Sequence, residues 1–371
     1  MRITDLEFVG LRSPLPSPAV FSWGSAHERN VGLVRVTLDD GTVGWGETSV
    51  TFPLWSMEER AATVSALREF FVGQAVTDAE SIAAVIGSTR VRTDRLRLLW
   101  SHVALSAALG AIEMALWDAL GRSLGRPVWE MLGGTPADIP LYAVGFGGTP
   151  DQAADAAAGL IAEGYRTVKV RAGFDPDDDV ALIRAVSERI GQGLLVDANM
   201  GWTRAEAATM VPRLEPFALG WLEEPLSRDD LAGYGELREL AAMPLAAGEN
   251  CYSGEELVAL AESGLVDVVM PDLARVGGLA PGITGARAAV AGGRGYSTHH
   301  YASDVGFAAM LALCAVVGDP QPILRDVSPW PLRTELLEDA LEISGGTARP
   351  YAGAGLAPAP RHDVVEEYRV L

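Results

Sequence analysis

The spacing of hydrophobic and polar positions changes near residue 139 of the chain. Before that point, short alternating segments predict three strands, over residues 3–13, 31–41 and 42–50. Apolar residues at helical spacing then predict three helices, over 57–71, 77–86 and 101–125. The last of these is long and mostly apolar, and by itself it indicates only a buried helix. Residues 14–30, rich in Pro, Ser and Gly, are predicted to form a long loop between the first two strands.

After residue 139, short apolar strands alternate with Ala-rich helices. This alternation favours a parallel α/β barrel, because each helix returns the chain to start the next parallel strand. Eight candidate strands are present, over residues 140–145, 167–173, 194–199, 219–225, 244–249, 266–272, 294–300 and 321–327.

Three consecutive strands of this series end in a carboxylate. Asp197 and Glu223 are 26 residues apart, and Glu223 and Glu249 are again 26 apart. Equal spacing predicts three successive βα units, and the carboxyl ends of such strands meet on one face of a barrel. Three carboxylates brought together repel one another unless a cation lies among them, and hard oxygen ligands suit Mg²⁺. The sequence therefore predicts a metal site.

Composition narrows the class of protein. The chain has 371 residues and a net charge of −20, which argues against nucleic-acid binding and means that an anionic substrate needs local positive charge. We expect no membrane association, because we find neither an apolar run of membrane-spanning length nor a signal-peptide pattern. Only Cys251 and Cys314 are present, which is typical of a reducing cytoplasm.

The single lysine of the chain is a candidate functional residue. Lys169 stands against 28 arginines, and it lies inside the apolar strand T-V-K-V. Lysine can lose its proton when it is desolvated, whereas arginine effectively cannot. Arg171, two residues further along the strand, is expected on the same face.

Other strand ends add polar candidates. Asn199 follows Asp197 by two residues, the sixth strand ends in Asp272, and the seventh ends in His299 and His300. The tandem histidines are compatible with a core pair, with metal ligands, or with an Asp–His pair in which the imidazole is a general base. In the predicted loops, Trp23, His27 and Arg29 are candidates for substrate contact, as are Thr51 and Trp55.

Together these segments resemble the enolase superfamily and, within it, the mandelate racemase subgroup. Residues 108–133 resemble the family's helix signature at the junction of its two domains, and the D-A-N, E-E-P and G-E-N segments resemble its three metal-ligand strands. P-D-L-A-R-V-G-G followed by S-T-H-H resembles the subgroup's Asp–His segments, with the dyad histidine at His299 and not at His300. The muconate-lactonizing branch has a lysine where Arg275 stands, so that branch is disfavoured.

The resemblance implies a fold and a chemistry. The fold is α/β, a modified TIM barrel of the (β/α)₇β type over residues 129–341, with an α+β capping domain made of residues 1–128 and the returning tail 342–371. The implied cofactor is Mg²⁺, held by Asp197, Glu223 and Glu249, and the shared step is removal of the proton α to a carboxylate. A small carboxylate substrate and a cytoplasmic homo-oligomer are also implied.

Two departures from the family pattern direct the functional hypothesis. The subgroup commonly has Lys-x-Lys on the second strand, and here the second position is Arg171, a poor base at neutral pH. Racemisation needs bases on both faces of the α-carbon, whereas dehydration can use His299 alone. On the eighth strand, relatives carry a glutamate near the substrate, and here the candidates are Arg325 and Asp326, the latter taken as substrate-binding.

The leading hypothesis is therefore an acid-sugar dehydratase that forms a 2-keto-3-deoxy acid. In this hypothesis Asp272 orients and charges His299, Lys169 holds the carboxylate and Arg171 stabilises charge, although Lys169 as the base remains an alternative. The second hypothesis is a racemase, epimerase or lactone cycloisomerase that uses the same enediolate intermediate. A third is a non-catalytic binding protein that has kept the barrel.

Overall fold

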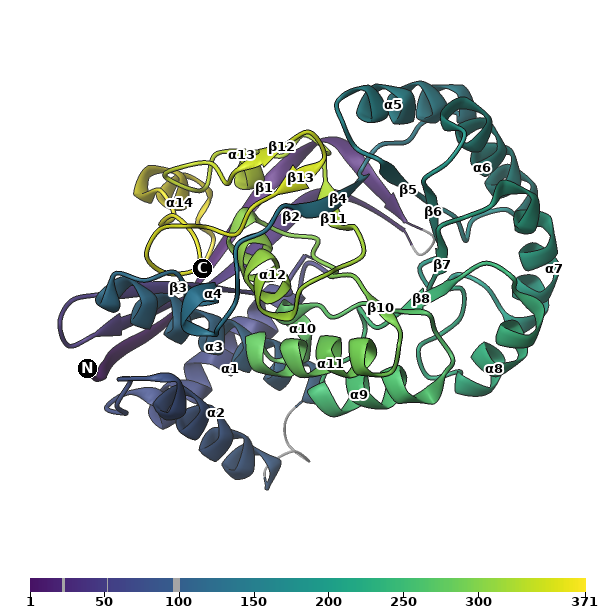
Figure 1. Cartoon of the computed structure of the whole chain (residues 1–371). Coiled ribbons are helices and arrows are strands. Elements are labelled where there is room, and N and C mark those ends of the chain that lie inside the picture. The colour runs from purple at the N-terminus through teal and green to yellow at the C-terminus, as the bar shows by residue number, and fades with distance from the viewer. Residues whose placement is uncertain (22–23, 52, 96–100) are drawn as a thin grey trace.

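The computed structural model describes residues 1–21, 24–51, 53–95 and 101–371 (Figure 1). The N-terminal part, which we call the N-terminal unit, consists of a three-stranded antiparallel sheet and four helices. Its elements are β1 (Ile3–Phe21), β2 (Gly24–Leu38), β3 (Val43–Thr48), α1 (Ser56–Phe71), α2 (Ala79–Asp94), α3 (His102–Leu124) and α4 (Val128–Met131).

The prediction of a long loop over residues 14–30 is wrong. Residues 14–21 and 24–30 continue the two strands as a ribbon, in which Pro14 pairs with Glu28 and Ala19 pairs with Ala26, with a shift of register between these pairs. Prolines cannot donate to a ladder, so they interrupt the register; β1 is an edge strand of its sheet, where prolines are tolerated. Trp23 lies outside the described residues.

Eight parallel strands form the barrel, and all eight were predicted from the sequence. They are β4 (Ile139–Val144), β5 (Thr167–Arg171), β6 (Leu194–Asp197), β7 (Trp221–Glu223), β8 (Leu245–Ala247), β9 (Val268–Val269), β10 (Gly295–Tyr296) and β11 (Ile323–Asp326). They follow one another in sequence order, and β11 pairs with β4. Backbone N–H groups of Gln321 and Leu324 donate to the oxygens of Tyr296 and Thr298, which joins β11 to the end of β10 and closes the ring.

Helices connect the strands and surround them (Figure 1). They are α5 (Pro150–Ala162), α6 (Pro176–Ile190), α7 (Arg204–Leu214), α8 (Leu231–Leu240), α9 (Gly254–Ser263), α10 (Leu273–Val276), α11 (Leu279–Ala291) and α12 (Asp304–Val317). Local sequence sets where several begin: Thr149 and Thr203 form capping boxes before α5 and α7, and Asp175 caps α6. This is the (β/α)₇β arrangement that the sequence predicted.

Alternation along the strands directs polar residues to one end of the barrel interior. A small buried cluster fills the interior, separate from the main core between strands and helices; it consists of Tyr142, Val144, Leu195, Trp221, Ala246, Val268, Met270 and Leu324. Because inward positions recur every second residue, Leu195 and Trp221 are followed on the inner face by Asp197 and Glu223. The same rule brings Lys169 and Arg171 to the inner face of β5, where both line one cavity.

The long helix α3 lies between the N-terminal sheet and the barrel (Figure 1). By length and composition it is apolar enough to cross a membrane, which corrects our expectation that no run is long enough. In the structure, however, 94% of the 18-residue apolar window of this helix is buried inside the protein, as in a core helix. Strand β3 packs closely against it through Gly44 and Gly46, where a side chain would overlap the helix backbone.

The C-terminal tail returns to both parts of the molecule. Leu371 accepts a hydrogen bond from the backbone N–H of Gly10 on β1 (3.0 Å), and the backbone N–H of Leu356 donates to Asp118 of α3 (2.7 Å). The elements of this part of the chain are α13 (Pro331–Thr334), β12 (Ile343–Ser344), β13 (Thr347–Ala348) and α14 (His362–Tyr368). Strand β13 pairs with β4 of the barrel. The domain boundaries at 128/129 and 341/342 stay predictions.

We predict that Gly46→Ala destabilises the protein. The added methyl group would overlap the backbone oxygen of Ala111 and lie 2.8 Å from the backbone nitrogen of Ala115, so the sheet and the helix must separate. Overpacking of this kind costs about 1–3 kcal/mol or more. The free energy of unfolding in urea measures it. Gly87→Ala is the matched control, because Gly87 lies in α2 with open space around it and alanine favours a helix. Equal stability of the two variants would contradict the prediction.

Candidate active site

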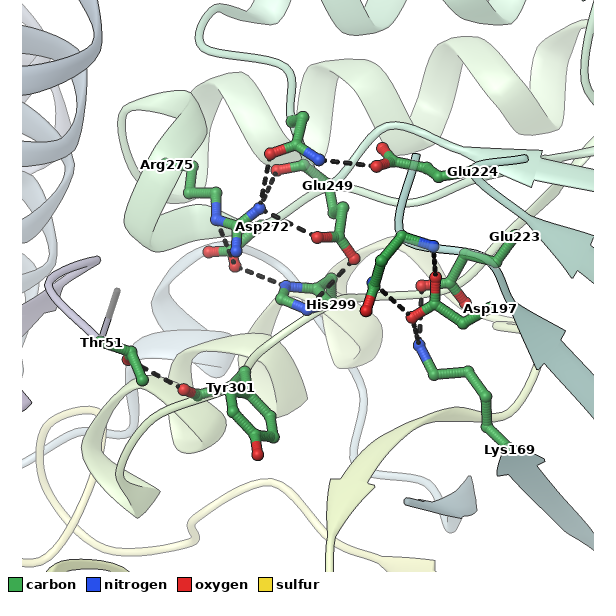
Figure 2. A network of polar contacts seen from close by, with 12 residues as sticks. Thr51, Lys169, Asp197, Glu223, Glu224, Glu249, Asp272, Arg275, His299 and Tyr301 are labelled. Carbon is green, nitrogen blue, oxygen red and sulfur yellow. Dashed lines mark hydrogen bonds and ion pairs between the residues drawn. The ribbon is translucent and has the colours of Figure 1, made fainter. Parts of the chain in front are cut away.

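The three predicted carboxylates meet at one end of the barrel. Asp197 and Glu223 end β6 and β7, and Glu249 follows β8. One carboxylate oxygen of each lies within 4.8 Å of the others, and all three side chains are buried (Figure 2). The equal spacing in sequence therefore corresponds to adjacency in space, as predicted from successive βα units.

The backbone beside these acids is strained. Asn199, Met200 and Glu224 all have positive φ, of 45°, 57° and 35°. Non-glycine residues rarely adopt this region, and such strain concentrates at functional sites. In the turn after β6, this conformation lets Asn199 donate its backbone N–H and its side-chain amide to the two oxygens of Asp197 (2.8 and 2.9 Å). Asp197 is thereby held in one orientation.

The single lysine lies against two of the acids (Figure 2). Lys169 is 2% exposed, and its Nζ donates to Asp197 (3.0 Å) and Glu223 (2.7 Å). Burial alone would lower the pKa of Lys169, but the two carboxylates outweigh burial and raise it well above its ordinary value. The lysine is therefore a buried cation of the cluster.

The third acid is paired on the opposite flank. One oxygen of Glu249 accepts a hydrogen bond from Arg275 (3.1 Å), and the other lies 3.2 Å from Nε2 of His299. Burial opposes ionisation of Glu249, but His299 and Arg275 outweigh it and lower the pKa to about 2. Lys169 and His299 thus flank the three acids from two sides.

The predicted Asp–His pair is formed in the structure. Nδ1 of His299 lies 2.7 Å from Oδ2 of Asp272, whose other oxygen caps the short helix α10. Burial would raise the pKa of Asp272, but the hydrogen bond with His299 and the charge of Arg275 lower it. With Nδ1 engaged, Nε2 is the nitrogen that faces the acids. His300 lies apart, with Nε2 2.8 Å from the backbone oxygen of Ser303.

The acid cluster has the properties of a cation site. Burial raises the pKa of Glu224 to about 8, and burial together with Asp197 raises that of Glu223 well above its ordinary value. Among the described residues, one buried oxygen of Glu224 has no hydrogen-bond partner, and the second oxygen of Glu249 has only its contact with His299. Buried carboxylates without partners are costly, and carboxylate oxygens suit a hard divalent cation. The three predicted ligands therefore fit such an ion.

A cavity of about 470 Å³ opens over the cluster. Its floor is formed by strand-end residues, and its cover comes from the N-terminal unit. Of the residues predicted to contact substrate, Asn199, Thr51 and Trp55 line this cavity. Arg171 also lines it, with its guanidinium 4.5 Å from the ring of Phe21 on the N-terminal ribbon.

Two other predicted residues are engaged with each other. Arg29 donates to Asp326 (2.7 Å) and lies between the rings of Tyr301 and Trp330. Asp326 also pairs with Arg333 (2.6 Å), and although burial would raise its pKa, the two arginines lower it to about 2. Both side chains are engaged in these contacts, and their direct contact with substrate stays a prediction.

The remaining candidates lie away from the cavity. Arg325 points outward from the barrel, where it pairs with Asp304 and stacks on Phe307, so Asp326 is the inward residue of that strand. His27 is exposed on β2 and does not line the cavity. Its role stays a prediction, as does that of Trp23, which lies outside the described residues.

A network from the N-terminal unit fixes the segment that follows His299. Glu47 of β3 is fully buried and accepts hydrogen bonds from the backbone N–H groups of Ser303 and Gly306 (2.9 and 2.8 Å) at the start of α12. The backbone oxygen of Tyr301 accepts from Thr51 (3.0 Å; Figure 2) and from Arg29 (3.1 Å). The N-terminal unit therefore determines where the loop after β10 lies.

Sequence reasoning missed several residues of the site. Glu224 was overlooked because strand alternation places it outward, and only its positive φ turns it back toward Asn250, which donates to it (2.6 Å). Arg275 was used only to distinguish family branches, although its position one helical turn after Asp272 was a signal. Tyr301 directly follows the histidine pair, and no motif or spacing in the sequence marks it as a site residue.

Comparisons with known proteins agree with this geometry. Residues 5–133 match the family model of the mandelate racemase/muconate lactonizing enzyme N-terminal domain, and residues 152–364 match that of the enolase C-terminal domain-like family. D-galactarolactone cycloisomerase from Agrobacterium fabrum is 31% identical over 386 aligned residues, which cover 100% of this chain and 99% of that protein.

Two further relatives carry other activities. D-gluconate dehydratase from Thermoproteus tenax is 31% identical, with 91% of this chain and 69% of that protein covered. The solved structure of a racemase from Streptomyces coelicolor A3(2) with bound magnesium is 25% identical, covers 99% of this chain and 100% of that chain, and superposes with a TM-score of 0.87. The relatives thus share a fold and differ in the reaction that they catalyse. This chain belongs to the mandelate racemase/muconate lactonizing enzyme family of the enolase superfamily.

Proposed function

We propose that this protein is a Mg²⁺-dependent lyase that removes the α-proton of a sugar acid and eliminates its β-hydroxyl group, giving a 2-keto-3-deoxy acid. The observation that carries the proposal is the position of His299, which is oriented by Asp272 and has Nε2 3.2 Å from Glu249. Histidine is the side chain most often used as a general base, and an imidazole at the edge of a carboxylate cluster is suited to proton abstraction.

The metal-binding part of the proposal rests on Asp197, Glu223 and Glu249, whose oxygens fit a hard divalent cation. The related racemase from Streptomyces coelicolor has bound magnesium, which favours Mg²⁺ among such ions. When bound, the ion would stabilise the negative charge that develops on the substrate carboxylate as the α-proton leaves.

Four side chains have separate roles in the proposed reaction. Lys169 holds the substrate carboxylate from the side opposite His299, and Arg171 adds positive charge at the cavity wall. His299 takes the α-proton at Nε2, and Asp272 stabilises the resulting imidazolium. The imidazolium then returns the proton to the departing β-hydroxyl, which leaves as water, and the enol product becomes the 2-keto acid in solution.

A lyase is favoured over a racemase because only one flank carries a suitable base. Racemisation needs a second base on the opposite face of the α-carbon, and there the cavity presents Arg171, which holds its proton at neutral pH. Lys169 is the other group on that flank, and it is paired with two carboxylates. Lys169 as base remains the alternative assignment.

Lactone cycloisomerisation is the second candidate, favoured by a specific observation. D-galactarolactone cycloisomerase matches this chain over its full length. Opening of a lactone by expulsion of the ring oxygen from the β-carbon begins with the same proton abstraction and differs only in the leaving group. The same residues would therefore serve, and the substrate decides between the two reactions.

The first prediction concerns His299→Asn, which keeps a group able to contact Asp272 but removes the base. General bases contribute about 10²–10⁴-fold, so we expect turnover to fall by at least about 100-fold. Proton NMR in D₂O with Mg²⁺ and a library of sugar acids, diacids and lactones measures it, through loss of the α-proton signal and appearance of a 2-keto product. Turnover equal to wild type would exclude this mechanism. Proton exchange without elimination would indicate an epimerase, and consumption of lactones alone would indicate a cycloisomerase.

The second prediction concerns metal binding and does not depend on activity. Mg²⁺ at a hundred times its Kd should stabilise the wild-type protein by about 2.7 kcal/mol relative to protein in EDTA. Glu249→Gln should abolish most of this gain, because it removes one ligand charge. Thermal unfolding with and without Mg²⁺ measures both. Glu262→Gln, an exposed acid on α9, is the control and should respond as wild type does. An equal response of the two variants would rule out the proposed ligand.

The third prediction concerns Lys169→Arg. This change keeps the charge, but the planar guanidinium is bulkier than the ammonium that lies between two carboxylates at 2.7 and 3.0 Å. Loss of one precisely placed charge donor costs about 10²–10³ in turnover, so we expect a loss of that size with an unchanged circular dichroism spectrum. Normal turnover would show that the single lysine has no special role.

A further inference from the structure

Arg60 of α1 is a buried cation with few partners. Its side chain is 6% exposed, and its Nη1 pairs with the carboxylate of the neighbouring Glu59. Among the described residues its buried Nε has no hydrogen-bond partner. A guanidinium has five N–H donors, and leaving a buried donor unpaired costs free energy. A buried arginine with an unpaired donor is suited to bind a ligand that carries hydrogen-bond acceptors.

A ligand bound in the cavity over the acid cluster would be able to contact Arg60. Arg60 lines the same cavity as Lys169, Asp197 and Glu249, although it belongs to the N-terminal unit. It stands on the wall that also contains Ser56. A ligand held at the cluster therefore faces Arg60 across the cavity.

The side of the cavity on which Arg60 stands can be identified. Tyr252, three residues after Glu249, interacts electrostatically with both Arg60 and Arg275. Arg275 pairs with Glu249 and Asp272 on the flank of the site opposite Lys169. Tyr252 is therefore near both arginines, and Arg60 belongs to the part of the cavity wall that contains Tyr252 and Arg275.

Charge distinguishes Arg60 from two other cations of the cavity, Lys169 and Arg275. Lys169 is bound to Asp197 and Glu223, and Arg275 is bound to Glu249 and Asp272, so both are neutralised by buried acids. Within the described ranges, the acid that pairs with Arg60 is Glu59, whose side chain is 36% exposed, so water screens its charge. In a chain of net charge −20, a buried guanidinium with spare donors is a local attraction for an anion.

We propose that Arg60 binds a carboxylate at the far end of the substrate, so that the preferred substrates are sugar diacids rather than monoacids. The inference rests on the proposed function and names its substrate class. A carboxylate is favoured over a hydroxyl group because it accepts from two N–H donors of one guanidinium and brings the opposite charge. One end of the substrate lies at the acid cluster and the other at Arg60.

Two pairs of acids test the proposal, D-glucarate with D-gluconate and D-galactarate with D-galactonate. Within each pair the molecules differ only at C6, which is a carboxylate in the first and a hydroxymethyl group in the second. Binding is measured by calorimetry with Mg²⁺ in the His299→Asn background, where turnover does not interfere, and kcat/KM is measured in the parent protein.

Arg60→Gln should weaken binding of the preferred diacid at least tenfold and change binding of its monoacid by less than threefold. Arg68→Gln is the matched control, because Arg68 is an exposed arginine of the same helix and pairs with Asp5. This variant should bind the diacid and the monoacid as the parent does. Glu59→Gln should leave diacid binding equal or tighter, since it releases Arg60. If Arg60→Gln fails to fold, Arg60→Lys keeps the charge and should still lose affinity for the diacid selectively.

Equal losses for diacid and monoacid in Arg60→Gln, or no loss for either, would overturn the proposal. The same conclusion follows if Glu59→Gln weakens diacid binding as Arg60→Gln does, because the pair would then be structural. Failure of the proposed function is a separate result: diacids that bind through Arg60 but never exchange their α-proton would remove the lyase and leave the binding role. Turnover of monoacids, unaffected by Arg60→Gln, would leave the lyase and remove the diacid preference.

Discussion

The mutual repulsion of buried carboxylates is the constraint on which this site depends. Asp197, Glu223 and Glu249 bring their oxygens within 4.8 Å of one another in a place nearly closed to water. Charges in such surroundings interact far more strongly than in water, so each needs a positive neighbour or a cation. Lys169 and Arg275 supply part of that charge from opposite flanks, and His299 lies beside the remaining oxygen of Glu249. The need to balance three buried negative charges therefore explains why cationic side chains surround the acids.

The barrel supplies the geometry, and the turns after its strands adjust it. Alternation along short strands is enough to bring Asp197 and Glu223 inward, and closure of β11 on β4 makes the carboxyl ends a ring. The residues just beyond the strands do not follow the alternation. Asn199 and Glu224 reach their positions through left-handed backbone, whose cost is compensated by hydrogen bonds to Asp197 and from Asn250.

Much of the fold and of the acid cluster could be predicted from the sequence, because these features repeat. The eight strands and the interval between Asp197, Glu223 and Glu249 are periodic, and the single lysine is a compositional outlier. Features that depend on contacts between distant segments had no such signal. The pairing of Arg29 with Asp326 joins residues 297 positions apart. The ribbon of residues 14–21 and 24–30 depends on strand pairing that its prolines hide from a sequence pattern. Arg60 belongs to an ordinary helical pattern, and only the folded cavity distinguishes it.

The anchoring of the loop after β10 by Glu47, Thr51 and Arg29 has a consequence for how the protein would fail on heating. The barrel is stabilised by its own ladder and core, whereas the loop beside His299 is stabilised by the neighbouring sheet. Detachment of that sheet would release the histidine while the barrel stays folded. Inactivation would then come before global melting, and grafting a foreign N-terminal part onto this barrel would shift the position of the base even if every barrel residue were kept.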